Sequence, residues 1–259
     1  MTQFIQFEIE NQVGKITLNR PDKFNSFVRE MALALQEKLD ECATNPEVRA
    51  VYLTGNGKAF CAGQDLAEAI DDNGIELQKI VSEHYNPVIQ KIRSIEKPVI
   101  CGINGVAAGA GANIALACDI TVATQSSVFI QAFSKIGLIP DSGGTYFLPR
   151  IIGMQKATAL MMLGDKVTAD EAESLGMIYK AVSDDTFEAT ALGIAQKLAK
   201  MPTKGLGLTK RLLNETFANN LEQQLQREDD LQTEAGNTFD YNEGVNAFLE
   251  KRKPNFKGE

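Results

Sequence analysis

The sequence of 259 residues contains a single histidine, His84, and no GxSxG motif. One imidazole nearly excludes a metal site built from several histidines. A Ser-His-Asp nucleophile is also disfavoured, because nothing else in the sequence marks the serine that such a triad needs. His84 stands in the helical-looking segment SEHYNPVIQKI, where we expect a partly buried structural residue.

Cysteine is scarce too, and no two cysteines form a CxxC pair. The cysteines that are present have small or apolar neighbours in the sequence, which is typical of reduced core thiols rather than of disulfides or metal ligands. They are Cys42, Cys61, Cys101 and Cys118. We therefore expect all of them to be free and buried.

An excess of positive charge and long apolar runs are also missing. With 26 Lys and Arg against 34 Asp and Glu, the net charge is −8. This argues against a nucleic-acid partner, because phosphate binding draws on clustered basic residues. The densest basic cluster, KRKPNFK at residues 251–257, is typical of a solvated chain end. No apolar run approaches eighteen residues and MTQFIQFEIE lacks a signal-peptide pattern, so we predict a cytoplasmic protein without membrane contact.

The elements that are present alternate between strands and helices. The β-rich runs at residues 3–9 and 13–18 suggest an N-terminal hairpin. From Phe27 to about Cys42 apolar residues recur at helical spacing, which predicts a helix. Further strands are predicted at residues 50–55, 98–103 and 119–124. This alternation favours an α/β architecture.

Capping patterns mark helices in the second half. Thr168 and Glu171 have the spacing of a capping box, and Gly176 is placed to end the helix that they open. Asp240 has the same spacing to Glu243, so we expect Asp240 to cap a later helix.

The change of pattern near residue 185 predicts two parts. Residues 1–185 form a mixed α/β body, and residues 186–259 form a helical C-terminal region. The second part is about half the size of a typical domain, so it has to lean on the body or on another subunit.

A glycine-rich segment, TGNGKAFCAGQDL at residues 54–66, follows a predicted strand and contains a Gly-Lys pair. It does not fit a Walker phosphate loop. Such a loop has four residues between its first glycine and the Gly-Lys pair, and a Ser or Thr after the lysine. Ala59 follows Lys58 here. We expect a loop that turns from a strand into a helix, with Gly63 allowing a tight backbone.

A second such segment, GINGVAAGAGANIALACDI at residues 102–120, leads from a strand into an apolar helix. Gly109 and Gly111 begin a GxGxx pattern, but Ile114 stands where a dinucleotide fingerprint has its third glycine. Small residues can serve close helix packing here. They also leave amide N–H groups at the helix start uncovered, and such groups can bind an anion or a developing oxyanion.

The third segment, KIGLIPDSGGTYFLPR at residues 135–150, holds one carboxylate, Asp141, in apolar surroundings. Burying a charge is costly unless it is paired. Asp141 therefore either caps a helix that begins at Ser142 or is kept for chemistry. The segment alone leaves both open, and the cap is the simpler explanation.

Taken together, these segments resemble the enoyl-CoA hydratase/isomerase (crotonase) superfamily. The resemblance runs along the whole chain, in the family's order and spacing. The matching motifs are ITLNRPDKFNS, AVYLTGNGKAFCAGQDL, KPVICGINGVAAGAG, KIGLIPDSGGTYFLPRIIG, LTKRLLN and YNEGVNAFLEKRKPNF. The resemblance implies an α/β fold that is a crotonase-like spiral of ββα units with a helical C-terminal trimerisation region. It also implies an acyl-CoA thioester substrate, a homotrimer or dimer of trimers, and no metal, nicotinamide or flavin cofactor.

The resemblance also implies roles for particular residues. Family members bind the thioester oxygen with two backbone amides, and the matching positions are Gln64 and Ala110. Such donors stabilise an enolate as its oxygen becomes charged. The positions that match CoA or substrate contacts are Lys23, Phe24, Phe60, Ala62, Gln64, Asp65, Leu66, Phe248 and Lys251. Lys251 could meet a phosphate, also across a subunit boundary, whereas plain helix packing is the alternative for Phe248.

Two departures from the family pattern bear on the reaction. Hydratases of the family carry two glutamates that activate water, and those positions here are Asn113 and Phe133. Neither side chain exchanges a proton near neutral pH, so a simple hydratase is disfavoured. Asp141 remains as the candidate sole acid/base, and an apolar setting is expected to raise its pKa.

Within the family, IPDSGGT and GVNAFLEKRKPNF most resemble the members that isomerise ring-1,2-epoxyphenylacetyl-CoA. The sequence leaves two alternatives. One is a generic enoyl-CoA hydratase or double-bond isomerase, and the other is a non-catalytic member that binds acyl-CoA or RNA.

Overall fold

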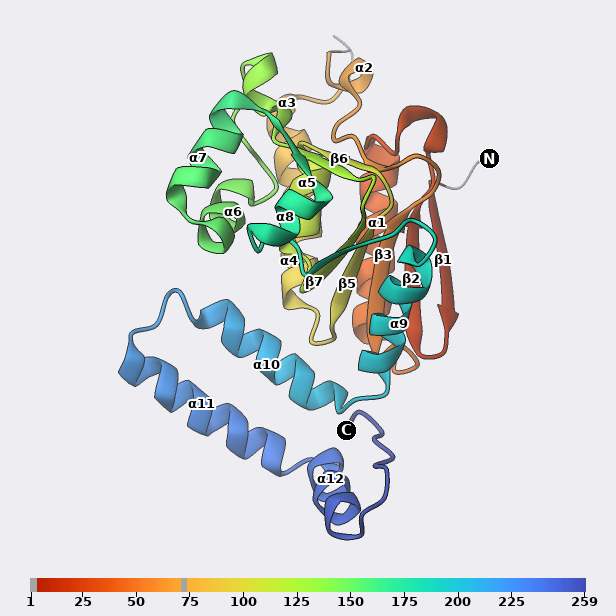
Figure 1. The fold of residues 1–259 in the computed structure, drawn as a ribbon, viewed down its shortest axis with the longest axis vertical. Coiled ribbons are helices and arrows are strands. Elements are labelled where there is room, and N and C mark those ends of the chain that lie inside the picture. Colours follow the sequence, from red (N-terminus) through yellow and green to blue (C-terminus); the bar gives the residue numbers. More distant parts are fainter. Residues whose placement is uncertain (1–3, 71–73) are drawn as a thin grey trace.

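Two β-sheets flanked by helices form the body of the molecule (Figure 1). The computed structural model describes residues 4–70 and 74–259. Its strands are β1 (Ile5–Glu10), β2 (Val13–Leu18), β3 (Ala50–Gly55), β4 (Ala59–Cys61), β5 (Val99–Ile103), β6 (Val106–Ala108), β7 (Ile120–Thr124), β8 (Val128–Ile130), β9 (Lys166–Thr168) and β10 (Lys180–Val182). Its longer helices are α1 (Arg29–Thr44), α4 (Asn86–Ser94), α5 (Ala110–Ala117), α6 (Gly144–Ile152), α7 (Met154–Leu163), α9 (Phe187–Ala199), α10 (Thr203–Glu215), α11 (Leu221–Gly236) and α12 (Phe239–Leu249). Its shorter helical elements are η1 (Pro21–Lys23), α2 (Leu66–Ala69), α3 (Leu77–Lys79), the π-helical turn η2 (Ile80–Tyr85), η3 (Ala132–Ile136) and α8 (Ala169–Ser174).

From β3 to β8 the strands alternate between the two sheets along the chain. The larger sheet has six strands in the order β1-β2-β3-β5-β7-β10, and the smaller has four in the order β4-β6-β8-β9. Three successive strand pairs, β3-β4, β5-β6 and β7-β8, each place their first strand in the larger sheet and their second in the smaller. A helical element follows each pair. The predicted α/β spiral of ββα units is confirmed.

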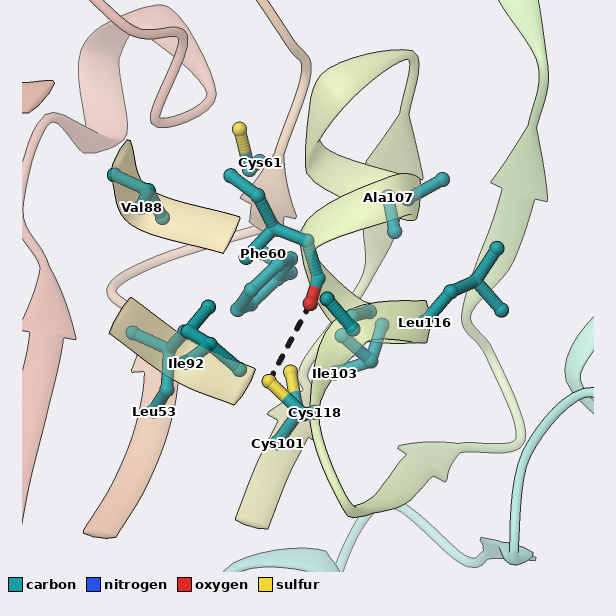
Figure 2. Close-up of a cluster of buried hydrophobic side chains, with 14 of the residues drawn as sticks. Leu53, Phe60, Cys61, Val88, Ile92, Cys101, Ile103, Ala107, Leu116 and Cys118 are labelled. Atoms are coloured by element: carbon teal, nitrogen blue, oxygen red, sulfur yellow. Dashed lines mark hydrogen bonds between the residues drawn. The ribbon is translucent and has the colours of Figure 1, made fainter. Parts of the chain in front are cut away.

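The central strands are buried on both faces, as a parallel sheet covered by helices requires. Strand β5, VICGI, is buried along its whole length. Figure 2 shows the core beside it, where the ring of Phe60 packs among Leu53, Ile92 and Ile103. Sequence patterns identified β3, β5 and β7 but missed the strands of the smaller sheet, which are only three residues long.

The cysteines are all free and buried, as predicted. Cys118 Sγ donates to the main-chain oxygen of Ile114 over 3.3 Å (Figure 2). The prediction for His84 is confirmed in kind, although the side chain is fully rather than partly buried. Its Nε2 lies 3.2 Å from a guanidinium nitrogen of Arg29, and burial lowers the pKa of His84.

Helix α1 differs from prediction at its start. It buries the expected stripe, including Met31, Leu35 and Leu39, but begins at Arg29 rather than at Phe27. Phe27 instead forms a parallel bridge with Gln64. Phe27 is buried like the apolar residues of α1, so it extends their apolar spacing. It is buried by its contact with a distant part of the chain and is not part of the helix.

The C-terminal helices play two different roles. Helix α9 packs on the larger sheet, where its buried face meets strands β3 and β5. Helices α10, α11 and α12, here named the C-terminal arm, lie apart from the sheets at the lower edge of Figure 1. The boundary predicted near residue 185 stays a prediction.

One buried lysine fastens the arm to the body. Lys210 on α10 is buried, and its Nζ donates to the main-chain oxygen of Ile92 over 2.7 Å. The same Nζ lies 2.8 Å from a carboxylate oxygen of Asp119. Desolvation lowers the pKa of Lys210, and the negative charge of Asp119 opposes that fall.

None of the helices within residues 4–70 and 74–259 combines the length and apolar character needed to span a bilayer.

Of the two predicted caps, one is confirmed and one is wrong. The Thr168 side chain accepts from the Glu171 N–H over 3.2 Å and opens α8. At α12 the N-cap is Thr238, not Asp240. Asp240 lies inside the helix and is buried, and its carboxylate accepts the N–H groups of Lys257 and Gly258 over 2.6 and 2.7 Å.

Asp240 thus ties the last residues of the chain to the arm, and its removal is expected to destabilise the protein. In Asp240→Ala the N–H groups of Lys257 and Gly258 lose a charged acceptor in part-buried hydrogen bonds, which costs about 2 kcal/mol of unfolding free energy. Thermal unfolding should show a fall in Tm of about 4–8 °C for a chain of this size. Asp229→Ala, at an exposed position of α11, is the matched control and should leave Tm unchanged.

Candidate active site

Asp141 lies in a turn between η3 and α6 that is left-handed at two successive residues. Ser142 and Gly143 have φ angles of 51° and 72°. Such an angle is unfavourable for a residue other than glycine, so the surroundings of Ser142 must hold it there. Ser142 is buried, and its hydroxyl donates to Asp141 Oδ1 over 2.8 Å.

The alternative that Asp141 caps a helix is wrong. Helix α6 begins at Gly144 rather than at Ser142, and no side chain caps it. Only the main-chain oxygen of Asp141 meets the helix start, where it accepts from the Gly144 N–H over 2.9 Å. The Asp141 carboxylate therefore makes no capping hydrogen bond to α6.

The electrostatics of Asp141 are those of a poorly solvated acid. Burial raises the pKa of the carboxyl group, and the hydrogen bond from Ser142 opposes the rise without cancelling it. This shift agrees with the direction expected from the apolar segment. A carboxyl group with a raised pKa can exchange protons closer to neutral pH than an ordinary aspartate.

The first predicted amide, that of Ala110, stands at the start of α5. Gly109 precedes it with a φ of 53°, and the Gly109 N–H donates to the oxygen of Ile130 over 2.9 Å. The N–H groups in the first turn of a helix have no acceptor within the helix. The fold therefore holds the Ala110 N–H in place without using it in the helix.

The second predicted amide, that of Gln64, belongs to the loop after β4. The Phe27 N–H donates to the oxygen of Gly63 over 2.7 Å, and the Asp65 N–H donates to the oxygen of Phe27 over 2.8 Å. In a parallel bridge of this kind, the residue between the two bonds directs its own N–H to the other side. The Gln64 N–H therefore faces away from Phe27.

The two loops are neighbours. A Cβ atom on Gly63 would stand 3.1 Å from the oxygen of Ala108 and 3.6 Å from the nitrogen of Ala110. Residues that are far apart in the sequence thus bring the Gln64 and Ala110 amides into one region, as the oxyanion-site prediction requires.

The side chain of Gln64 is fixed by two hydrogen bonds. Its Oε1 accepts from the Tyr85 hydroxyl over 2.8 Å, and its Nε2 donates to Glu68 over 2.7 Å. Burial raises the pKa of Tyr85, and the nearby charge of Asp141 adds to the rise. Tyr85 therefore contacts the candidate site through the side chain of Gln64. The sequence analysis missed it, because a tyrosine in a helical segment carries no distinguishing signal.

The predicted CoA contacts mostly surround this region. Lys23 and Phe24 are exposed at the end of η1, and the oxygen of Phe24 accepts from the Ala62 N–H over 3.0 Å. Leu66 is exposed beside them. Asp65 is instead bound to Arg20 over 2.6 Å, and although its burial opposes ionisation, this guanidinium and the Ala67 N–H hold the pKa of Asp65 below its usual range.

Phe60 needs a correction as a side-chain contact. Its ring is fully buried in the core (Figure 2), so only its main chain can face a ligand. Phe248 and Lys251 are not brought to the other residues within one chain, since α12 lies at the opposite end of the molecule from α2 and β6 (Figure 1). The packing alternative for Phe248 is also wrong, because its side chain is 82% exposed.

Of the two positions that hold glutamates in family hydratases, Phe133 lies near the start of α5 and Asn113 contacts Asp141. The ring of Phe133 stands 3.7 Å from where a Cβ atom on Gly109 would be. Asn113 is fully buried, and its Nδ2 donates to the main-chain oxygen of Asp141 over 2.9 Å. Within residues 4–70 and 74–259, no group of three His, Cys, Asp or Glu side chains is placed to hold a metal ion.

Comparison with known proteins agrees with this geometry. The family model for enoyl-CoA hydratase/isomerase matches residues 8–259. The chain belongs to this enoyl-CoA hydratase/isomerase family. The 1,2-epoxyphenylacetyl-CoA isomerase of Escherichia coli K12 is 46% identical over 262 residues, covering 100% of both chains. A protein of Rhodobacter capsulatus named probable enoyl-CoA hydratase is 42% identical over 254 residues, covering 98% of both.

A solved structure of the family has the same fold. The crystal structure of an enoyl-CoA hydratase from Polaromonas sp. JS666 matches with a TM-score of 0.91 and 35% identity, over 97% of this chain and 99% of that one. Membership of the family makes this protein an acyl-CoA-converting enzyme with a crotonase fold.

The raised pKa of Asp141 is expected to set the acid limb of activity. A base must be deprotonated to accept a proton, so kcat/KM falls as the pH is lowered through that pKa. Ser142→Gly and Ser142→Ala both remove the hydroxyl that stabilises the charged form. In each variant the limb should move to higher pH, by up to about one unit, as measured by a pH series of initial rates. An unmoved limb in both variants would contradict the assignment, and Ser134→Ala, an exposed serine nearby, serves as the control.

Proposed function

We propose that this enzyme is an acyl-CoA isomerase in which Asp141 is the sole acid/base and the Gln64 and Ala110 amides hold the thioester oxygen. The observation that carries the proposal is the freedom of the Asp141 carboxylate. It sits in a half-buried turn, has a raised pKa and has a neighbouring hydroxyl as its hydrogen-bond donor, while the helix start uses only the main chain.

The proposed reaction moves one proton. The thioester makes the adjacent C–H acidic, and the carboxylate of Asp141 takes that proton while the two N–H groups bind the enolate oxygen. The carboxylic acid then returns the proton to a different carbon. No atoms are gained or lost, so substrate and product have equal mass.

A single acid/base group suits isomerisation better than hydration. Hydration needs a further group that activates water, and the two positions that serve this purpose in family hydratases hold Asn113 and Phe133. Asn113 is occupied with the Asp141 main chain, and Phe133 presents an apolar ring near Gly109. Neither can accept a proton from water.

The acyl group proposed is ring-1,2-epoxyphenylacetyl, which the enzyme would convert to the seven-membered oxepin thioester in aerobic phenylacetate catabolism. The C–C bond between the two epoxide carbons breaks, its electron pair joins the ring double bonds and both carbons keep the oxygen. The proton that Asp141 takes from beside the thioester returns to a ring carbon. This proposal is supported by the similarity to the Escherichia coli 1,2-epoxyphenylacetyl-CoA isomerase over the whole of both chains. A shift of the double bond in an unsaturated acyl-CoA uses the same proton transfer, so we include it as a second activity.

We further propose that the protein assembles as a homotrimer or a dimer of trimers, in which Phe248 and Lys251 reach the CoA of a neighbouring subunit. The C-terminal arm exposes several large apolar side chains, which are Leu221, Leu225, Phe248 and Leu249. Side chains of this size and exposure favour an interface. Lys251 would supply a positive charge for a CoA phosphate.

Replacement of Asp141 tests the chemistry directly. Asp141→Asn keeps the shape of the side chain but removes the proton carrier, so turnover should fall by about 10³-fold. The wild type and the variant are incubated with 1,2-epoxyphenylacetyl-CoA and, separately, with a 3-enoyl-CoA, and the products are read by mass spectrometry and ultraviolet spectra. Equal mass with altered absorbance means isomerisation, whereas an added water or near-normal turnover by the variant contradicts the proposal.

Replacement of Ala110 tests the oxyanion site. Proline is tolerated at the first position of a helix, where its missing N–H leaves no helical hydrogen bond unmade. Ala110→Pro should therefore keep the fold but lower kcat by about 10²-fold to 10³-fold, measured with the same thioesters. Ala110→Ser keeps the N–H and is the matched control. Full activity of the proline variant, with unchanged Tm, would rule out this amide as a donor.

A further inference from the structure

Helix α5 reaches both halves of the candidate site. Its first residue is Ala110, and one turn later Asn113 donates from Nδ2 to the main-chain oxygen of Asp141 over 2.9 Å. That oxygen also accepts from the Gly144 N–H over 2.9 Å. A carbonyl oxygen has two lone pairs, so both are in use. The peptide that follows Asp141 cannot rotate without breaking one of these bonds.

The amide of Asn113 fits directly beneath the turn. A Cβ atom on Gly144 would collide with the Asn113 carboxamide. The turn above it is left-handed at Ser142, a conformation that persists only when the surroundings impose it. Asn113, which is held in place by helix α5, is one of the residues that impose this conformation on the turn.

A second amide fixes the orientation of the first. Gln131 Nε2 donates to Asn113 Oδ1 over 2.8 Å. If the Asn113 amide were reversed, its oxygen would face the oxygen of Asp141 and its nitrogen would face the nitrogen of Gln131. Both contacts would then be repulsive, so only one arrangement of the two amides is compatible with the turn.

Packing alone does not explain a glutamine at position 131. It is only 3% exposed, and within the described parts of the chain its Oε1 has no hydrogen-bond partner. An unsatisfied buried oxygen costs stability, whereas an apolar side chain of the same size would not. Among the described residues the side chain of Gln131 makes one hydrogen bond, to Asn113, and this bond accounts for an amide at position 131.

We propose that Asn113 and Gln131 are positioning residues, which together aim the Asp141 carboxylate at the carbon held beneath the Gln64 and Ala110 amides. This inference rests on the proposed role of Asp141. Because Ala110 and Asn113 share one helix, α5 positions both the Ala110 donor and the turn that carries the base. Gln131 acts only through Asn113.

The test compares Asn113→Leu, Gln131→Leu, the double variant and Asp141→Asn, assayed with 1,2-epoxyphenylacetyl-CoA and a 3-enoyl-CoA. Misplacing a reacting group by about 1 Å can cost 10²-fold in rate. We therefore expect kcat to fall about 10-fold to 100-fold in each single variant, with KM changed by less than about 3-fold. If Gln131 works through Asn113, the double variant should be no slower than Asn113→Leu.

A control separates positioning from loss of stability. Thr203→Val removes a hydrogen bond of 2.8 Å from Arg49, at the base of the C-terminal arm, and should lower Tm without lowering kcat. If Asn113→Leu does not fold, Gln131→Leu carries the test, because its replacement also removes an unsatisfied oxygen.

Each outcome has one meaning. Full kcat in the Asn113 and Gln131 variants, beside an inactive Asp141→Asn, overturns the positioning role and leaves the proposed function standing. Additive losses in the double variant overturn the link through Asn113, and parallel changes in kcat and KM overturn a purely positional effect. Near-normal turnover by Asp141→Asn overturns the proposed function and this inference with it.

Discussion

The close contact between helix α5 and strand β4 is the constraint on which the rest of the site depends. A Cβ atom on Gly111 would collide with the main-chain oxygen of Cys61, so α5 can lie there only because residue 111 has no side chain. This contact brings the start of α5 beside the loop that carries Gln64. Main-chain donors cannot be moved by a rotamer change, so their positions are as precise as the packing of the two segments.

Asp65, Asp240 and Asp141 are all shielded from bulk water, and their partners differ. Asp65 is bound to a guanidinium and an amide, which keeps it charged at low pH. Asp240 accepts two main-chain N–H groups and holds the end of the chain. The carboxylate of Asp141 accepts a hydrogen bond from the neutral Ser142 hydroxyl, and burial raises the pKa of Asp141. A group that the fold leaves incompletely compensated is a candidate for function, because a purely structural acid would gain from a stronger partner.

Much of the fold followed from the sequence, and the exceptions have physical reasons. The buried strands β3 and β5 are continuous apolar runs and α1 has a periodic apolar stripe, so all three were predicted within two residues. The three-residue strands of the smaller sheet are too short to show a period. Asp240 has the spacing of a capping box to Glu243, but Thr238, two residues earlier, is also a residue type that caps helices. Local patterns could not choose between them, because the true partners of Asp240 come from the returning chain end.

The candidate site was predictable to the same extent. Asp141, Gln64 and Ala110 stand in recognisable motifs, whereas Tyr85 and Gln131 contact the site from segments that have no motif. Their contributions depend on contacts between distant parts of the chain. Phe60 shows the opposite error, since a residue inside a functional motif can serve the core alone.

The burial of Lys210 has a consequence for chemical labelling. Its ammonium group is enclosed between α10 and the body, where it contacts Asp119 and the oxygen of Ile92. Reagents that acylate amines can reach it only when α10 lifts away, while the exposed lysines react at all times. The extent of acylation at Lys210 therefore measures how often the C-terminal arm dissociates from the body.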